Sequence, residues 1–150
     1  MTQQCIRVRF GSALPEGAPG SDGDGKLNLK VIFTDLPQTA AALRIARDMA
    51  RGLGARITLI ATQVVPYPLP LTAPDVPVAF TERQLKSIVP ENIAIQVFLC
   101  RDRCEALRRA LPHDAVVIVG APNRRWWPSW ETQLTRLLRR EGRNVLMVNA

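Results

Sequence analysis

Short apolar runs alternate along the chain with segments whose apolar residues recur at spacings of three and four. The apolar runs predict five buried strands, at residues 27–35, 56–65, 93–100, 115–120 and 144–149. The segments between these runs predict amphipathic helices. Strands that alternate with helices are joined by right-handed crossovers, so we expect an α/β fold: a five-stranded, mainly parallel sheet with helices on both faces.

Capping signals mark the ends of the expected helices. The first helix carries one apolar face, made of Leu43, Ala46, Ala50 and Leu53. Gly54 suits the left-handed conformation just past its end. Asp102 and Ser129 are expected N-caps of two later helices. Thr81–Gln84 form a capping-box pattern, which predicts a short helix that starts there and stops before Pro90.

The chain divides into an extension and one folded domain. Residues 11–25 are rich in glycine and contain almost nothing that could enter a core, so we interpret residues 1–25 as a flexible N-terminal extension. Residues 5–10, CIRVRF, alternate as strand residues do and are compatible with pairing at a sheet edge. The folded domain is expected over residues 26–150. Five prolines between Pro66 and Pro77 predict an excursion without regular structure, whose role the sequence leaves open.

Composition and charge narrow the class of protein. With 47% apolar and 22% charged residues, the chain has the balance of a soluble globular protein. No apolar run approaches the ~18 residues of a membrane-spanning helix. The three cysteines, an odd number, argue against a disulfide framework, and we expect a cytoplasmic protein without a secretion signal. The net charge of +7 favours anionic partners without naming one.

Two stretches, residues 27–66 and 92–150, resemble the universal stress protein family. The resemblance rests on VIFTD, on the block AALRIARDMARGLGARITLI, and on DAVVIVG followed by a loop, an amphipathic helix and NVLMV. It implies a Rossmann-like sheet of order 3-2-1-4-5 with a crevice between strands one and four. One subgroup of the family binds ATP in that crevice. Family dimers commonly pair through the last strand, here Asn144–Asn149.

The ATP motif of that subgroup, Gly-x2-Gly-x9-Gly-Ser/Thr, is degenerate in this chain. Gly120 matches its first glycine, and Asn123 stands at the second. At the strict spacing the last pair is Gln133 and Leu134, neither of which fits, whereas a loop two residues shorter places Glu131 and Thr132 there. A triphosphate is held by free backbone N–H groups and by the positive end of a helix dipole, so a carboxylate at this position repels it. We therefore expect no resident cofactor, while ATP or another adenine nucleotide stays open.

The candidate cofactor-binding residues follow from the motif and from its surroundings. The resemblance gives Asp35, Gly120, Asn123 and Thr132. Arg124 and Arg125 are added because guanidinium groups can supply what the lost N–H groups do not. Asp35 is open to two interpretations, the N-cap of the first helix or a contact to a nucleoside.

All three tryptophans, Trp126, Trp127 and Trp130, lie within five residues of the loop and first turn after the fourth strand. Their rings have three interpretations: they fill the space of a nucleotide, form a surface for a protein partner, or pack over the sheet edge.

A basic cluster of Arg136, Arg139, Arg140 and Arg143 is assigned to the polar face of the last helix. Such a run is typical of a solvated face. The alternative is a nucleic-acid-binding function: these arginines would neutralise the phosphates of a single strand, and Trp126 and Trp127 would stack on its bases.

Candidates for catalysis and for metal binding are few. Cys100 and Cys104 have no paired CxxC motif or nearby histidine, so no metal site is expected, although Arg101 and Arg103 beside them would lower a thiol pKa and favour redox sensing. His113 is the only histidine and is expected at the amino edge of the sheet, opposite the crevice. We therefore predict a non-enzymatic regulatory or interaction module that forms a homodimer.

Overall fold

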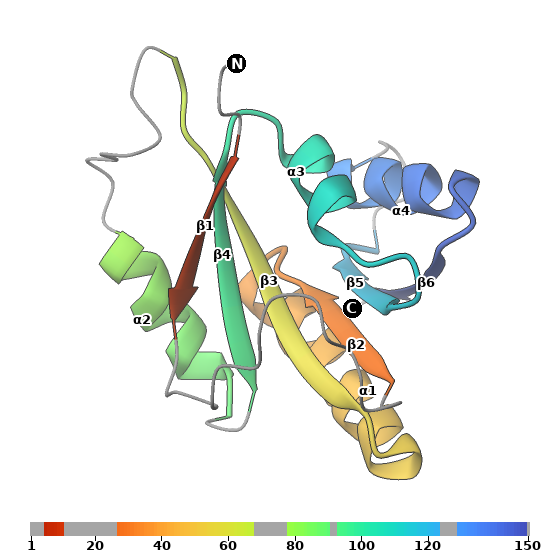
Figure 1. The fold of residues 1–150 in the computed structure, drawn as a ribbon. Helices are drawn as coiled ribbons and strands as arrows, with labels where there is room; N and C mark the ends of the chain where they lie inside the picture. The colour runs from red at the N-terminus through yellow and green to blue at the C-terminus, as the bar shows by residue number, and fades with distance from the viewer. Residues whose placement is uncertain (1–4, 11–26, 68–77, 91–92, 124–128, 150) are drawn as a thin grey trace.

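The computed structural model describes residues 5–10, 27–67, 78–90, 93–123 and 129–149. They form one six-stranded sheet with helices on both of its faces (Figure 1). The strands are β1 (Cys5–Phe10), β2 (Asn28–Ile32), β3 (Arg56–Val64), β4 (Ala94–Cys100), β5 (Val116–Ala121) and β6 (Asn144–Asn149). The helices are α1 (Leu36–Leu53), α2 (Val78–Ile88), α3 (Arg103–Ala110) and α4 (Trp130–Arg140).

The strands follow the order β1-β4-β3-β2-β5-β6. Strands β2 to β6 pair in parallel, and β2 lies between β3 and β5. Counted from β2 onward, this is the predicted order 3-2-1-4-5, so the fold class is confirmed. The strand order reverses at β2 and β5, whose carboxyl ends mark the place where ligands bind in sheets of this kind.

The sixth strand lies inside the predicted extension. Strand β1 runs antiparallel to β4, with Cys5 opposite Cys100 and Phe10 opposite Ile95. This corrects the predicted boundary in part, because backbone pairing with β4 brings residues 5–10 into the sheet. The predicted flexible stretch 11–25 lies outside the described residues.

Two apolar clusters, one on each face of the sheet, hold the layers together. Helices α1 and α2 cover one face, and side chains such as Leu43 and Leu85 pack there against Val31 and Leu59. Helices α3 and α4 cover the other face. Its buried core includes Ile32, Ile60, Val117, Leu107, Leu134 and Leu138. The parallel strands at the centre of the sheet are therefore covered by helices on both faces. This explains why the sequences of these strands are continuous apolar runs.

Most of the predicted helix ends are confirmed. Asp35, Asp102 and Ser129 are the N-caps of α1, α3 and α4, and each side chain accepts a hydrogen bond from a backbone N–H three residues later. Gly54 ends α1 with a left-handed φ of 63°. These short-range signals depend only on neighbouring residues, so the sequence carries them directly.

Two expectations about helices are wrong. Leu53 is 59% exposed, because the buried residues of α1 end at Ala46 and its last turn runs past the core. Helix α2 begins at Val78, so Thr81 stands inside the helix instead of capping it.

Helix α1 lies very close to β5 at the reversal point of the sheet. Gly120 of β5 is buried, and a Cβ atom added to it would lie 2.7 Å from the carbonyl carbon of Gln38 and nearer still to the carbonyl oxygen. Backbone atoms of a helix's first turn cannot shift aside as a flexible side chain can. Residue 120 must therefore be glycine for α1 to pack in this position.

We expect Gly120→Ala to lower the free energy of unfolding by about 1–3 kcal/mol, because the added methyl group overlaps the backbone of Gln38. Gly52→Ala is the matched control, since Gly52 lies in α1 with no atom within 4 Å of an added Cβ. It should raise the free energy of unfolding by about 0.5–1 kcal/mol. Urea denaturation measures both, and equal effects at the two sites would contradict the close contact.

Candidate functional site

The turn after β2 contributes Asp35 to the carboxyl edge of the sheet. Its Oδ1 accepts a hydrogen bond from the backbone N–H of Gln38 at 3.0 Å. The hydroxyl oxygen of Thr39, a buried residue, accepts from the backbone N–H of Thr34, also at 3.0 Å. The cap interpretation of Asp35 is thus confirmed, and the side chain is exposed beside the reversal point.

The end of β5 contributes Gly120 and, after it, Asn123. Gly120 faces the first turn of α1, so the packing of the helix accounts for its missing side chain. Asn123 is exposed two residues beyond Ala121, the last residue of β5. Arg124 and Arg125 lie outside the described residues. The structure therefore brings Asp35 and Gly120 to the same edge of the sheet.

The start of α4 contributes Thr132 and Glu131. Thr132 belongs to the cap of this helix, since its backbone N–H donates to Ser129 Oγ at 3.4 Å and the two hydroxyl oxygens lie 3.2 Å apart. Glu131 is only 7% exposed. Among the described residues, its Oε2 has no hydrogen-bond partner. The first turn of α4 therefore already holds a buried carboxyl group.

Two arginines near this edge lie over aromatic rings. The guanidinium carbon of Arg103 is 4.4 Å from the centre of a Trp130 ring, and that of Arg101 is 4.1 Å from the centre of the Tyr67 ring. Trp130 is half-buried and packs against the core beneath α4. Arg101 also donates to the carbonyl oxygen of Val65 at 2.7 Å. The packing interpretation thus holds for Trp130, although it packs against the core of the α3/α4 face and no contact places it over a sheet edge, whereas Trp126 and Trp127 lie outside the described residues.

The cysteine next to Asp102 does not have the properties of a reactive thiol. Burial raises the pKa of the Cys104 thiol above its usual range, the Asp102 carboxylate raises it further, and Arg103 acts in the opposite sense. A raised pKa leaves less thiolate at neutral pH. The structure thus gives no support at Cys104 to the redox hypothesis drawn from Arg101 and Arg103. Across the described part of the chain, no three His, Cys, Asp or Glu side chains gather as a metal site would need.

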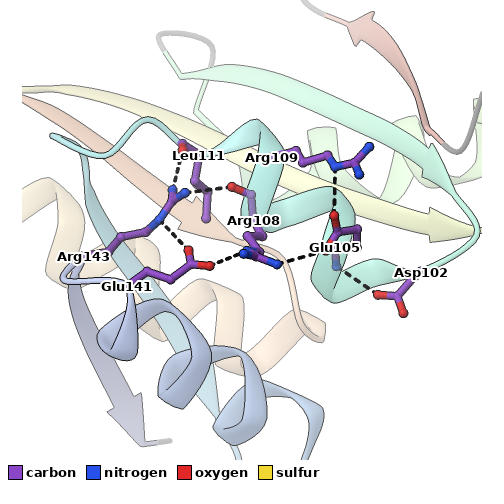
Figure 2. A network of polar contacts seen from close by, with 7 residues as sticks. All are labelled: Asp102, Glu105, Arg108, Arg109, Leu111, Glu141 and Arg143. Atoms are coloured by element: carbon purple, nitrogen blue, oxygen red, sulfur yellow. Dashed lines mark hydrogen bonds and ion pairs between the residues drawn. The ribbon is translucent and has the colours of Figure 1, made fainter.

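A second polar group lies at the opposite, amino edge of the sheet, between α3 and the turn from α4 to β6 (Figure 2). At its centre is Arg143, which is only 7% exposed. Its guanidinium donates to the carbonyl oxygen of Arg108 at 2.9 Å and to that of Leu111. The last carbonyl groups of a helix have no partner within it, so Arg143 caps the end of α3.

Carboxyl groups tie the other arginines of this group together. Glu141 lies 3.3 Å from Arg143 Nε and also contacts Arg108 Nε (Figure 2). Glu105 contacts Arg109 at 2.8 Å and Arg108 at 3.5 Å. We call these five residues the amino-edge cluster; they are Glu105, Arg108, Arg109, Glu141 and Arg143. With His113 they line an open cavity of about 550 Å³.

The placement of Arg143 corrects the sequence interpretation. Arg143 follows Gly142, whose φ of 77° turns the chain after the end of α4, so its side chain folds back onto α3 instead of joining a solvated helix face. Arg136, Arg139 and Arg140 are exposed, as expected, and Arg139 also donates to the carbonyl oxygen of Val145 at 3.2 Å. The glycine just before Arg143 is the signal in the sequence that separates it from the other three. His113 lies at the amino edge, as expected.

We expect Arg143→Ala to lower the free energy of unfolding by about 2–4 kcal/mol, because two carbonyl groups at the end of α3 lose their hydrogen-bond donor and Glu141 keeps only its contact with Arg108. Arg143→Lys should recover only part of this loss, since an ammonium lacks the planar fork that spans two acceptors. Arg140→Ala, at an exposed position, is the control and should change stability by less than about 0.5 kcal/mol. If Arg140→Ala were as costly as Arg143→Ala, the cap would not be the cause.

Comparison with known proteins supports the fold. No protein-family model and no curated protein sequence matches the chain. The chain's own described helices include none that is long and apolar enough to cross a membrane.

Two solved structures are similar to the chain. A macrolide-efflux protein from Streptococcus pneumoniae matches at 16% identity and a TM-score of 0.44, over 85% of this chain and 46% of that one. A crystal structure of a protein from the universal stress protein family, from Burkholderia pseudomallei, is similar at a TM-score of 0.55 and 20% identity, and covers 85% of this chain and 99% of that one. The chain therefore has the α/β fold of a universal stress protein.

Proposed function

We propose that the chain is a non-enzymatic regulatory or interaction module of the universal stress protein type, with a degenerate nucleotide site. The shared fold supports the class. The single observation that carries the proposal is the buried Glu131 in the first turn of α4. This is the turn where the resemblance places the phosphate-binding glycine of ATP-binding family members.

The chemistry of Glu131 opposes a bound triphosphate. Phosphates bind at helix N-termini because free backbone N–H groups and the helix dipole point toward them. In α4 the N–H of Thr132 donates to Ser129 Oγ, and the carboxyl group of Glu131 is buried beside it. Two unit charges about 5 Å apart repel by roughly 3 kcal/mol at an effective dielectric constant of about 20, which corresponds to an affinity loss of about a hundredfold. We infer that ATP binds weakly at most.

The non-enzymatic assignment rests on the separation of the reactive groups. His113, the chain's one histidine, lines the cavity at the amino edge, whereas Asp35 stands at the carboxyl edge. A general base must lie within hydrogen-bond reach of the proton that it removes. His113 is therefore placed too far along the sheet to serve a ligand at Asp35.

The two alternatives remain distinguishable from this proposal. One is an ATP- or adenine-nucleotide-binding stress protein that uses Asp35 with Arg124 or Arg125. The other is a module for single-stranded nucleic acid, whose binding would weaken steeply with salt. Of the predicted basic cluster, Arg136, Arg139 and Arg140 are exposed and are the described residues that such binding would use.

We expect the purified protein to release no stoichiometric adenine nucleotide on denaturation, and Glu131→Gln to bind ATP at least about tenfold more tightly than the original chain, because the repelling charge is removed. Isothermal titration calorimetry measures both affinities. Glu105→Gln is the control, since Glu105 lies in the amino-edge cluster and its charge should not affect ATP. Tight ATP binding by the unaltered chain would overturn the proposal in favour of the first alternative.

The proposed module is a homodimer that forms through β6. Within the described sheet, β6 pairs with β5 alone, so its outer backbone groups face no other described strand. Leu146 at its middle is 39% exposed. An apolar edge strand with unpaired backbone groups offers a template for a second copy, and a two-fold axis beside the strand would pair it with itself.

We expect light scattering to give the mass of a dimer at micromolar concentration, and Leu146→Lys to shift the protein to the monomer, because a charge on an edge strand opposes pairing. Leu53→Lys introduces the same change at a position that is 59% exposed at the end of α1, and it should leave the dimer intact. A monomeric unaltered chain would contradict this part of the proposal while leaving the prediction about ATP untouched.

A further inference from the structure

Two cysteines far apart in the sequence stand directly opposite each other in the sheet. Cys5 is the first residue of β1, Cys100 is the last residue of β4, and the antiparallel register pairs them. Directly opposed residues of antiparallel strands have Cα atoms about 4.5 or 5.5 Å apart, depending on the type of pair. A disulfide joins Cα atoms roughly 4.4 to 6.8 Å apart, so either type of pair is within its reach.

We propose that Cys5 and Cys100 form a reversible disulfide that fastens β1 to the sheet. The third cysteine, Cys104, lies in helix α3 and is not part of the strand pair that brings Cys5 opposite Cys100. The inference depends on the pairing of β1 with β4 and is independent of the nucleotide site and of the dimer.

Oxidation of the Cys100 thiol depends on the edge strand β1, because Cys100 is buried in the neighbouring strand β4. Cys100 is fully buried, and its thiol lies 3.8 Å from the carbonyl oxygen of Gln63 on β3. Strand β4 lies between β3 and β1, and β1 pairs with β4 alone in the described sheet. Edge segments open locally more readily than the core of a domain. Opening of β1 would uncover the outer side of β4 at Cys100, and closing of β1 would bring Cys5 back opposite it.

The reaction needs a two-electron oxidant, and a peroxide supplies it. Hydrogen peroxide transfers one oxygen atom to the sulfur of one cysteine, forming a sulfenic acid and releasing one water. The sulfur of the second cysteine attacks this sulfur, the S–S bond forms, the S–O bond breaks, and a second water leaves. Two thiols and one peroxide thus give one disulfide and two waters. A dithiol reduces the disulfide by exchange and is itself oxidised.

The disulfide would close a long loop, since it joins residues 5 and 100 of the chain. A cross-link that closes a long loop removes many conformations from the unfolded ensemble and so stabilises the folded state. We therefore expect oxidation to raise the Tm by about 5 °C or more. The same bond would hold β1 against β4 and slow the hydrogen exchange of its amides.

Peptide mapping of the full chain tests the assignment directly. The protein is oxidised with hydrogen peroxide, remaining thiols are alkylated, and the chain is digested with trypsin without reduction. Cleavage after Arg7, Arg101 and Arg103 leaves the three cysteines on three separate peptides. The expected product joins the peptides of Cys5 and Cys100, with Cys104 alkylated, and dithiothreitol should reverse both the link and the rise in Tm.

Variants separate the proposed disulfide from other effects of oxidation. Cys5→Ser should abolish the link and the rise in Tm, whereas Cys104→Ser, the matched control, should keep both. The proposal is overturned if mapping finds Cys5 and Cys100 alkylated after oxidation, if Cys104 replaces either of them in the link, or if Cys5→Ser retains the rise. The mapping uses the unaltered chain, so its result holds even where a variant fails to fold.

Discussion

The close packing of α1 on β5 determines what the carboxyl edge of this sheet can do. Strand β2 lies between β3 and β5, so the chain order reverses there and α1 leaves from the end of β2 beside β5. The carbonyl group of Gln38 then occupies the space where residue 120 would place a side chain. Thr39 and Asp35 bond back to the same turn. Helix backbone and caps therefore occupy the carboxyl edge beside Gly120, and the fold requires a glycine at this position whether or not a ligand binds.

The arginines of this chain serve its structure more than the net charge suggests. Arginine supplies 17 of the 20 basic residues. Arg143, Arg101 and Arg139 each donate to backbone carbonyl oxygens, and Arg103 lies over a tryptophan ring. The planar guanidinium group suits all of these contacts, which a lysine ammonium makes less well. A net charge of +7 therefore does not by itself indicate binding to nucleic acid.

The sequence predicted what depends on neighbouring residues and missed what depends on distant ones. Asp102 and Ser129 were predicted as caps, and a cap was one of the two interpretations of Asp35, because a cap needs only the next three residues. The parallel sheet followed from the alternation of strands and helices, and its order followed from the family resemblance. The contact from Arg143 to Leu111 joins residues 32 positions apart, so helical spacing assigned Arg143 to the wrong surface. The unpartnered oxygen of Glu131 also depends on tertiary packing, although the motif alignment had placed an acid at that position.

The two edges of the sheet differ in a way that bears on association. Exposed edge strands invite pairing, and proteins commonly guard them with charged residues. Strand β1 has the sequence CIRVRF, with two arginines, and it covers the outer side of β4 in antiparallel pairing. Strand β6 has the sequence NVLMVN, with no charged residue, and it pairs with β5 in parallel. Of the two described edge strands, only β6 has no charged residue that would oppose pairing with a second copy of the chain. In the proposed homodimer, this difference in sequence would favour a closed pair through β6 over an open row of molecules, because an open row would need both edges to accept a neighbour.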